Sequence, residues 1–120
     1  MAKKLVIKVT AGAEAPERCA QAFTVASVAA ASGVEVSLWL TGESAWFALP
    51  ERAAEFALPH SAPLTDLMAA IQANGRITLC TQCAARRDIT ETDVVEGVRI
   101  AGAQVFVGEI MPDGVKSLVY

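Results

Sequence analysis

The sequence predicts an α/β fold, a three-layer α/β/α sandwich built on a mainly parallel five-stranded sheet. Short apolar runs of strand length alternate with longer helical patterns, which is typical of strands joined by crossing helices. The connections between the first four runs are long enough for the dozen or more residues that a parallel crossover needs. Because 120 residues can bury one sizeable core, we expect a single domain over residues 1–120.

The first half of the chain carries the clearest signals. A helix is predicted over residues 16–32, because Pro16 suits a first helical turn, Glu17 suits the positive end of the helix dipole and Gly33 suits a stop. Cys19 shares the apolar face of this helix with Phe23, Ala26 and Ala30, so we assign it to packing. The five predicted strands are residues 3–9, 34–40, 76–80, 104–108 and 115–120.

The second half is predicted from weaker signals. Residues 44–59 offer short helical pieces broken by prolines, and residues 63–75 carry an amphipathic stripe that ends at an Asn-Gly pair. A helix is also predicted over residues 90–102, with Thr90 and Asp93 as a capping pair. Only residues 108–114 join the last two predicted strands, and their Pro-Asp-Gly turn favours an antiparallel last strand.

Composition excludes several classes of function. The net charge is −3, the pI is about 5.1 and the basic residues are scattered, so we expect no nucleic-acid or anionic-membrane binding. Lys8 interrupts the N-terminal apolar run, which argues against a signal peptide, and residues 19–34 fall short of the ~20 that a membrane span needs. We therefore expect a cytoplasmic protein with reduced thiols. The 53% apolar fraction, rich in small residues, indicates close-packed helices or a subunit interface.

Three loops are expected to meet at the carboxyl ends of the parallel strands, where sites form in open α/β sheets. The loop over residues 10–15 contains Thr10 and Gly12 but neither phosphate-binding glycine pattern, so it is either a small-residue turn or part of a pocket wall. In the loop over residues 41–46, Gly42 suits a turn, and Glu43 and Trp46 either line a pocket or join the core or an interface. The third loop, residues 80–88, begins with the thiol pair.

Cys80 and Cys83 form a C-x-x-C pair after the third strand. Such spacing brings two sulfurs close together, and exposed amides with Arg86 and Arg87 would stabilise a thiolate, the nucleophile in persulfide and disulfide chemistry. The pair could instead be inert and buried, since cysteine often acts as a small hydrophobe.

A metal site finds little support in the residue types. A closed zinc site would have to add Cys19 and His60 and borrow from a second subunit, so we expect no metal and no cofactor. We expect an ordinary surface or capping role for His60. The thiol pair also lies too late in the chain, without an intervening proline, for a thioredoxin site.

The chain resembles the DsrE/DsrF-like family of sulfur-relay and YchN-like proteins. Residues 5–46 are similar to the family's opening strand, small-residue loop, Pro-started Ala-rich helix, second strand and second loop. The segment CTQCAARRDI is similar to the family's C-x-x-C-x-x-A-R-G-[IV] segment. Asp88 stands where the family usually has glycine, and residues 43–45 depart from the family's second loop.

The resemblance implies a DsrEFH-like sandwich that assembles as a homotrimer or homohexamer and carries a persulfide between a sulfur donor and an acceptor protein. Cys80 would be the carrier, Cys83 its partner or resolver, and Arg87 the family's arginine. The alternative is an oligomeric small-ligand-binding or regulatory module with non-catalytic cysteines. A third hypothesis is a redox protein with a Cys80–Cys83 disulfide.

Overall fold

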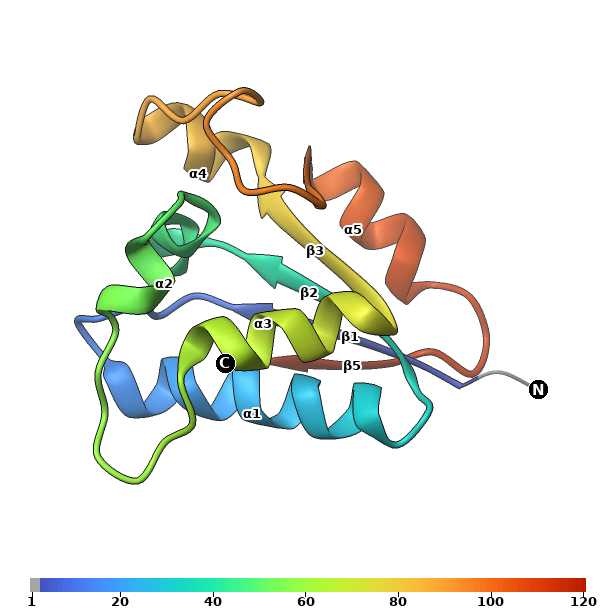
Figure 1. Cartoon of the computed structure of the whole chain (residues 1–120). Helices are drawn as coiled ribbons and strands as arrows, with labels where there is room; N and C mark the ends of the chain where they lie inside the picture. Colours follow the sequence, from blue (N-terminus) through green and yellow to red (C-terminus); the bar gives the residue numbers. More distant parts are fainter. Residues whose placement is uncertain (1–2) are drawn as a thin grey trace.

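The computed structural model describes residues 3–120 and shows a five-stranded, all-parallel sheet with strand order β4-β3-β2-β1-β5. Helices lie on both faces of this sheet, as the sequence predicts (Figure 1). Residues 1 and 2 of the expected single domain lie outside the described part. The elements are β1 (Lys4–Val9), α1 (Pro16–Ala31), β2 (Glu35–Leu40), the 3-10 helix η1 (Gly42–Ala48), α2 (Arg52–Glu55), α3 (Leu64–Ala73), β3 (Gly75–Cys80), α4 (Thr81–Arg86), β4 (Val98–Ala101), α5 (Ala103–Ile110) and β5 (Lys116–Val119).

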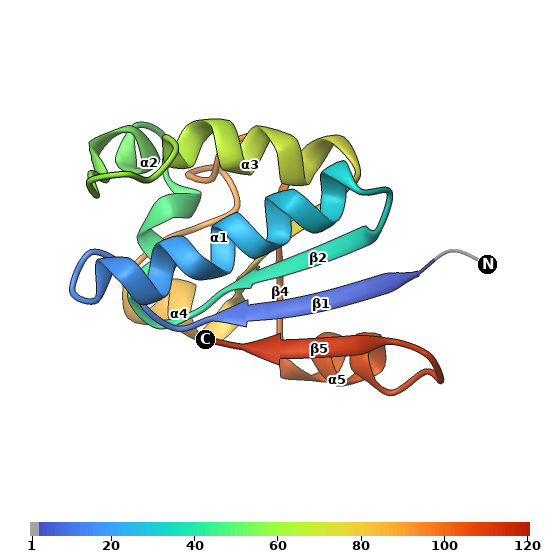
Figure 2. The ribbon, with the colours of Figure 1, turned by 90° about the horizontal axis from the view of Figure 1, so that it is seen from below.

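The two faces of the sheet are covered unequally. Helices α1 and α3 cover one face, whereas α5 lies alone on the other (Figure 2). Since side chains alternate along a strand, each central strand sends one set of residues into each layer. Ile7, Leu38 and Ile77 belong to the large core under α1 and α3, whereas the smaller opposite cluster comprises Val6, Trp39 and Phe106.

Helix α1 confirms the sequence prediction closely. Pro16 begins it, Glu17 lies in its first turn, and Gly33 follows its end with a φ of +88°, a left-handed conformation that glycine adopts without a steric cost. Cys19 is fully buried on the core face, which confirms its assignment to packing.

The helix predicted over residues 90–102 is wrong. Asp93 does accept hydrogen bonds from the Thr90 amide (2.8 Å) and hydroxyl (2.9 Å), but these bonds stabilise a run of turns. Gly97, with a φ of +89°, then leads into β4, which pairs parallel with β3. The Thr-x-x-Asp spacing therefore formed a local turn motif instead of a helix cap.

The fourth strand predicted over residues 104–108 is also wrong, because these residues belong to α5. Their β-branched and aromatic composition favours a strand, but β4 and β5 lie at opposite edges of the sheet. The chain between them must cross the whole sheet, and α5 does so while burying Phe106 against Trp39. Tertiary packing thus overrides the intrinsic preference of this segment.

The antiparallel orientation predicted for the last strand is wrong for the same reason. Strand β5 pairs parallel with β1, in a register that places Leu5 beside Lys116 and Lys8 beside Val119. With α5 as the crossover, the turn over residues 111–115 joins a helix to a strand instead of joining two strands. The whole connection then meets the length requirement of a parallel pair.

Candidate functional site

The three predicted loops do meet at the carboxyl ends of the strands. Two glycines allow this contact, because a Cβ on Gly12 would lie 2.6 Å from the Glu43 carbonyl oxygen and one on Gly42 would lie 2.5 Å from that of Thr10. Gly42 also has a φ of +54°, which favours glycine at this turn. The first two loops are therefore packed backbone against backbone.

Cys80 is the last residue of β3 and the residue immediately before α4. Its side chain is half-buried, and this burial is the largest single influence on the thiol and opposes its ionisation. The amides of Cys83 and Gln82, the Cys83 thiol and the positive charge of Lys8 together outweigh burial and lower the pKa of Cys80 below its ordinary value. The surroundings of Cys80 therefore favour its ionisation.

Cys83 lies one turn further along α4 and is buried, with 8% of its surface exposed. The Gly42 amide donates a hydrogen bond to its sulfur over 3.3 Å, which links α4 to the second loop. The two thiols are thus unlike each other: Cys80 is partly open to solvent, and Cys83 is held between elements.

The Arg87 side chain contacts Glu43 and the backbone of Cys83. Its guanidinium donates to the Glu43 carboxylate over 2.7 Å and to the Cys83 carbonyl oxygen over 3.1 Å, and this ion pair holds the pKa of Glu43 below its usual range. It also lies 5.8 Å from the centre of the Trp46 ring. Arg86 is exposed and has no ion pair among residues 3–120. A thiolate-stabilising role for this pair stays a prediction.

The remaining predicted site residue is Thr10, at the end of β1. Its hydroxyl donates to the Tyr120 carbonyl oxygen over 2.7 Å, so this side chain ties the first loop to the segment after β5. Asp88, at the position where the family usually has glycine, has a φ of +55°. Its backbone therefore adopts the left-handed conformation in which glycine is common.

Sequence reasoning missed Lys8, which acts on Cys80 from β1. The signal was present, because Lys4 and Lys8 interrupt the apolar run of β1 with even spacing and must share one face of the strand. That face is the one covered by α5, and Cys80 shares it through the registers of β2 and β3. A face assignment of each strand would have brought the two side chains together.

The other titratable candidates lie away from the site. Burial, with a smaller contribution from the charge of Glu14, raises the pKa of Cys19 to about 12, which keeps this thiol protonated at neutral pH. His60 is exposed in the loop before α3. In the described chain, no three His, Cys, Asp or Glu side chains are grouped so that they could hold a metal ion.

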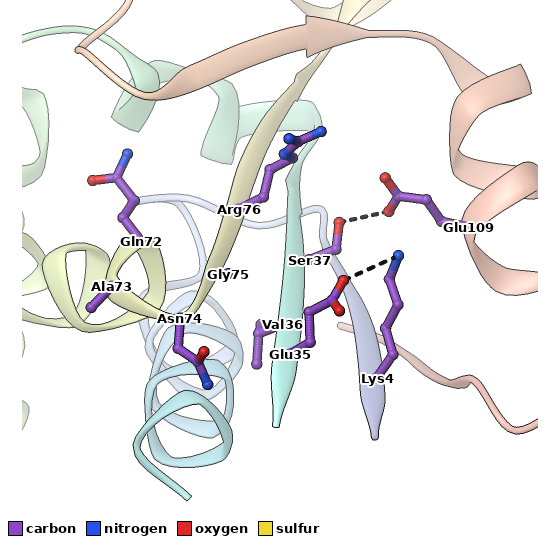
Figure 3. Close-up of a pocket in the computed structure, with 10 residues that line it drawn as sticks. All are labelled: Lys4, Glu35, Val36, Ser37, Gln72, Ala73, Asn74, Gly75, Arg76 and Glu109. Carbon is purple, nitrogen blue, oxygen red and sulfur yellow. Dashed lines mark hydrogen bonds and ion pairs between the residues drawn. The ribbon is translucent and has the colours of Figure 1, made fainter. Parts of the chain in front are cut away.

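Two hollows in the surface differ in how close they lie to the candidate residues. One, of about 240 Å³, lies beside the second loop and is lined by Glu43, Trp46 and Phe47 among others. A more polar one, of about 510 Å³, lies at the amino ends of the central strands, and Figure 3 shows Arg76 and Glu109 on its wall. The second hollow is at the opposite end of the sheet from Cys80.

No helix in residues 3–120 combines the length and the apolarity that crossing a bilayer demands.

Comparisons with known proteins agree on the fold. The family whose sequence model matches is the DsrE/DsrF-like family, over residues 3–112. The chain is similar to the crystal structure of the ychN protein from E. coli, with a TM-score of 0.78 and 18% identity over 100% of both chains. No curated protein sequence matches.

Two further solved structures are similar, and both are described as proteins of unknown function. MTH1491 from Methanobacterium thermoautotrophicum has a TM-score of 0.70 and 9% identity, over 98% of this chain and 99% of that one. BT1422 from Bacteroides thetaiotaomicron has a TM-score of 0.64 and 15% identity, over 98% of this chain and 95% of that one. At such identities the likeness extends to the fold alone.

Proposed function

The chain belongs to the DsrE/DsrF-like family, and from this premise we propose that it is a cytoplasmic persulfide carrier whose sulfur-accepting residue is Cys80. The observation that carries the proposal is the position of Cys80 at the end of β3, half-buried, with a lowered pKa. A thiolate attacks sulfur far faster than a thiol does, so this environment suits sulfur transfer at neutral pH.

The proposed transfer needs no outside oxidant or reductant. The Cys80 thiolate attacks the terminal sulfur of a donor persulfide, R–S–SH, so that a new S–S bond forms at Cys80 while the donor's S–S bond breaks. The donor leaves as the thiolate R–S⁻, and Cys80 becomes Cys80–S–SH, which ionises to the persulfide anion. An acceptor thiolate then attacks the outer sulfur, and the Cys80 thiolate is regenerated. Donor and acceptor would be other proteins of the relay.

Cys83 is proposed as the supporting thiol. Its contact with Cys80 favours the anionic form, and its sulfur is held by the Gly42 amide. It could also attack the Cys80 persulfide, releasing sulfide and leaving a Cys80–Cys83 disulfide, which an external dithiol would have to reduce. Cys83→Ser should therefore lengthen the life of the loaded state without preventing its formation.

Intact-mass spectrometry tests the carrier directly. After incubation with a small-molecule persulfide and removal of the excess, wild type should gain about 32 Da, the mass of one sulfur atom that a thiolate accepts. Cys80→Ser should gain nothing, whereas Cys19→Ser should load like wild type because Cys19 is buried in the core. A wild-type protein without the adduct, or a Cys80→Ser variant that retains it, would contradict the proposal.

The second candidate function is a small-ligand-binding or regulatory module, and one observation favours it. The hollow beside the second loop has an aromatic floor that includes Phe47 and Phe56, and a charged rim that includes Glu43 and Arg52. Trp46 lies on the same wall, with the Arg52 guanidinium 4.7 Å from its ring centre. Such a mixture of aromatic and charged groups suits a small ligand with one polar end. Failure of sulfur loading in the mass experiment would favour this module.

Assembly as a homotrimer or homohexamer is part of the proposal. The α5 side of the molecule exposes several large apolar side chains that are 40 to 70% exposed, and these are Val105, Val107, Met111 and Val119. A cluster of this kind is typical of a subunit interface. Helix α5 lies on this face of the sheet, opposite α1 and α3 (Figure 2).

Light scattering coupled to gel filtration tests the assembly. Wild type should have three or six times the chain mass of 12.6 kDa, and Val107→Asp should shift toward the monomer because burying an unpaired carboxylate in an interface is costly. The matched control is Val28→Asp, which places the same charge on α1 at a valine that is 59% exposed. A wild-type monomer, or a Val107→Asp variant that assembles like wild type, would contradict this interface.

A further inference from the structure

We infer that Lys8, held over the Phe106 ring, is a positioning charge that adds to the effect of the α4 amides in favouring the anionic form of Cys80 from the α5 side of the sheet. This inference rests on the proposed function, because it identifies the group that would prepare Cys80 for sulfur transfer. It also gives a role to the layer that contains α5, because neither Lys8 nor Phe106 belongs to the three loops.

The strand registers place the two side chains on the same face. Lys8 is beside Trp39, which is beside Thr78, and Cys80 lies two residues further along β3 in the same direction as Thr78. Because side chains at i and i+2 of a strand share a face, Lys8, Trp39, Thr78 and Cys80 all point toward α5.

Helix α5 directs the lysine toward the carboxyl end of the sheet. Ala101, the register partner of Cys80, precedes this helix by two residues, so the first turn of α5 starts beside the thiol. Phe106 lies at the end of that first turn, and the Lys8 ammonium group is 4.1 Å from its ring centre. A cation over an aromatic face is attracted by the ring, so Phe106 restrains the lysine near this end of the sheet.

The other charges on this face are either compensated or distant. Lys4 pairs with Glu35 at the amino end (3.6 Å), and Arg99 pairs with Glu109 of α5, which also accepts a hydrogen bond from Ser37 (Figure 3). The side chains of β5 on this face, Ser117 and Val119, carry no charge.

Two cations on this face have no ion pair among the described residues, Lys8 and Arg76. Arg76 is four residues from Cys80 along β3, about 13 Å at the strand rise. On this face of the sheet, Lys8 is therefore the cation without an ion pair that lies nearer the carboxyl end among the described residues. Arg87 is closer to Cys80 in sequence, but its charge is paired with Glu43.

Partial burial strengthens this interaction. Cys80 and Lys8 are both half-buried, and Trp39 between their strands is only 1% exposed, so the space between the two groups contains little water. Charges separated by protein are screened less than charges separated by solvent. The thiolate, and then the persulfide anion, would both be favoured by the lysine.

The test is the pH dependence of Cys80 alkylation by iodoacetamide, followed by peptide mass spectrometry of each cysteine. Lys8→Met should move the titration of Cys80 to higher pH and slow its alkylation at pH 7 by about threefold or more, because only the thiolate reacts. Phe106→Leu should give a smaller shift in the same direction. Lys8→Arg should restore the wild-type profile, since it returns the charge.

Lys4→Met is the matched control, because it removes a lysine from the same face of the same strand, four residues away. It should leave the Cys80 titration where it is in wild type. A Lys8→Met profile that overlays wild type, or a Lys4→Met shift of equal size, would overturn the inference. Thermal unfolding of each variant separates a lost charge from a damaged fold, and a shift seen only in variants that melt early also counts against it.

Alkylation requires no sulfur donor, so the two proposals fail separately. If Cys80 accepts no sulfur but Lys8→Met still shifts its titration, the carrier function is contradicted and the role of Lys8 is supported. If Cys80 accepts sulfur normally and Lys8→Met does not shift its titration, the carrier function is supported and the role of Lys8 is contradicted.

Discussion

Replacing Trp39 by alanine is expected to lower the free energy of unfolding by about 3–5 kcal/mol, the usual cost of removing a fully buried aromatic side chain. Trp39 is 1% exposed and packs edge-on against Phe106 at 5.3 Å between ring centres. Its indole N–H donates to Glu109 over 3.0 Å, so its removal takes away one of the bonds that hold α5 to the sheet. Urea denaturation followed by circular dichroism measures the loss, which is large against the roughly 5–15 kcal/mol of a typical domain.

The matched variant is Trp39→Phe, which keeps an aromatic ring but removes the N–H donor. It should cost less than Trp39→Ala, because the Glu109 carboxylate still accepts from Ser37 and Arg99. If Trp39→Ala unfolded at the same urea concentration as wild type, the packing of α5 described above would be incorrect.

Gly42→Ala is expected to destabilise the protein by about 2–4 kcal/mol, because it combines a left-handed backbone cost with a steric clash. The φ of Gly42 is +54°, and the new Cβ would lie 2.5 Å from the Thr10 carbonyl oxygen, a backbone atom that cannot rotate away. The clash also displaces the Gly42 amide from the Cys83 sulfur. Cys83 should therefore be alkylated faster in the variant, while thermal unfolding reports the lost stability.

Two other glycines separate the contributions to this effect. Gly33→Ala has the backbone cost alone, because its φ is +88° but nothing lies within 4 Å of the new Cβ. Gly12→Ala has the clash alone, with the Glu43 carbonyl oxygen at 2.6 Å. Gly42→Ala should be more harmful than Gly33→Ala, and only Gly42→Ala should expose Cys83 directly. Equal effects at Gly33 and Gly42 would mean that the contact between the first two loops contributes little.

Much of the fold could be predicted because the first three strands and α1 depend on local signals. Pro16 and Gly33 mark the ends of α1, and the apolar runs of β1, β2 and β3 supply most of the buried side chains on the α1 side. The convergence of three loops followed from one general rule about parallel sheets. The position of Cys80 at the carboxyl end of β3 followed from that rule as well.

The errors arose where long-range packing decides the structure. Residues 104–108 are helical because the chain must cross from one edge of the sheet to the other, which local composition does not encode. Lys8 lies 72 positions before Cys80, and only the pairing of three strands brings the two to one face. Similarly, Arg87 pairs with Glu43 of η1, which lies 44 positions earlier in the chain.

The pairing of β1 with β5 has a consequence for how the chain folds during synthesis. Strand β1 is the second strand from one edge, yet its outer neighbour comes from residues 116–119. Until those residues leave the ribosome, one side of β1 presents unpaired amides and carbonyls, the kind of edge at which strands of different chains join. Closing so long a loop is also slow. The charged side chains of Lys4 and Lys8 on the unpaired strand would disfavour such joining. The same two lysines would therefore protect the chain from aggregation before it reaches the native state.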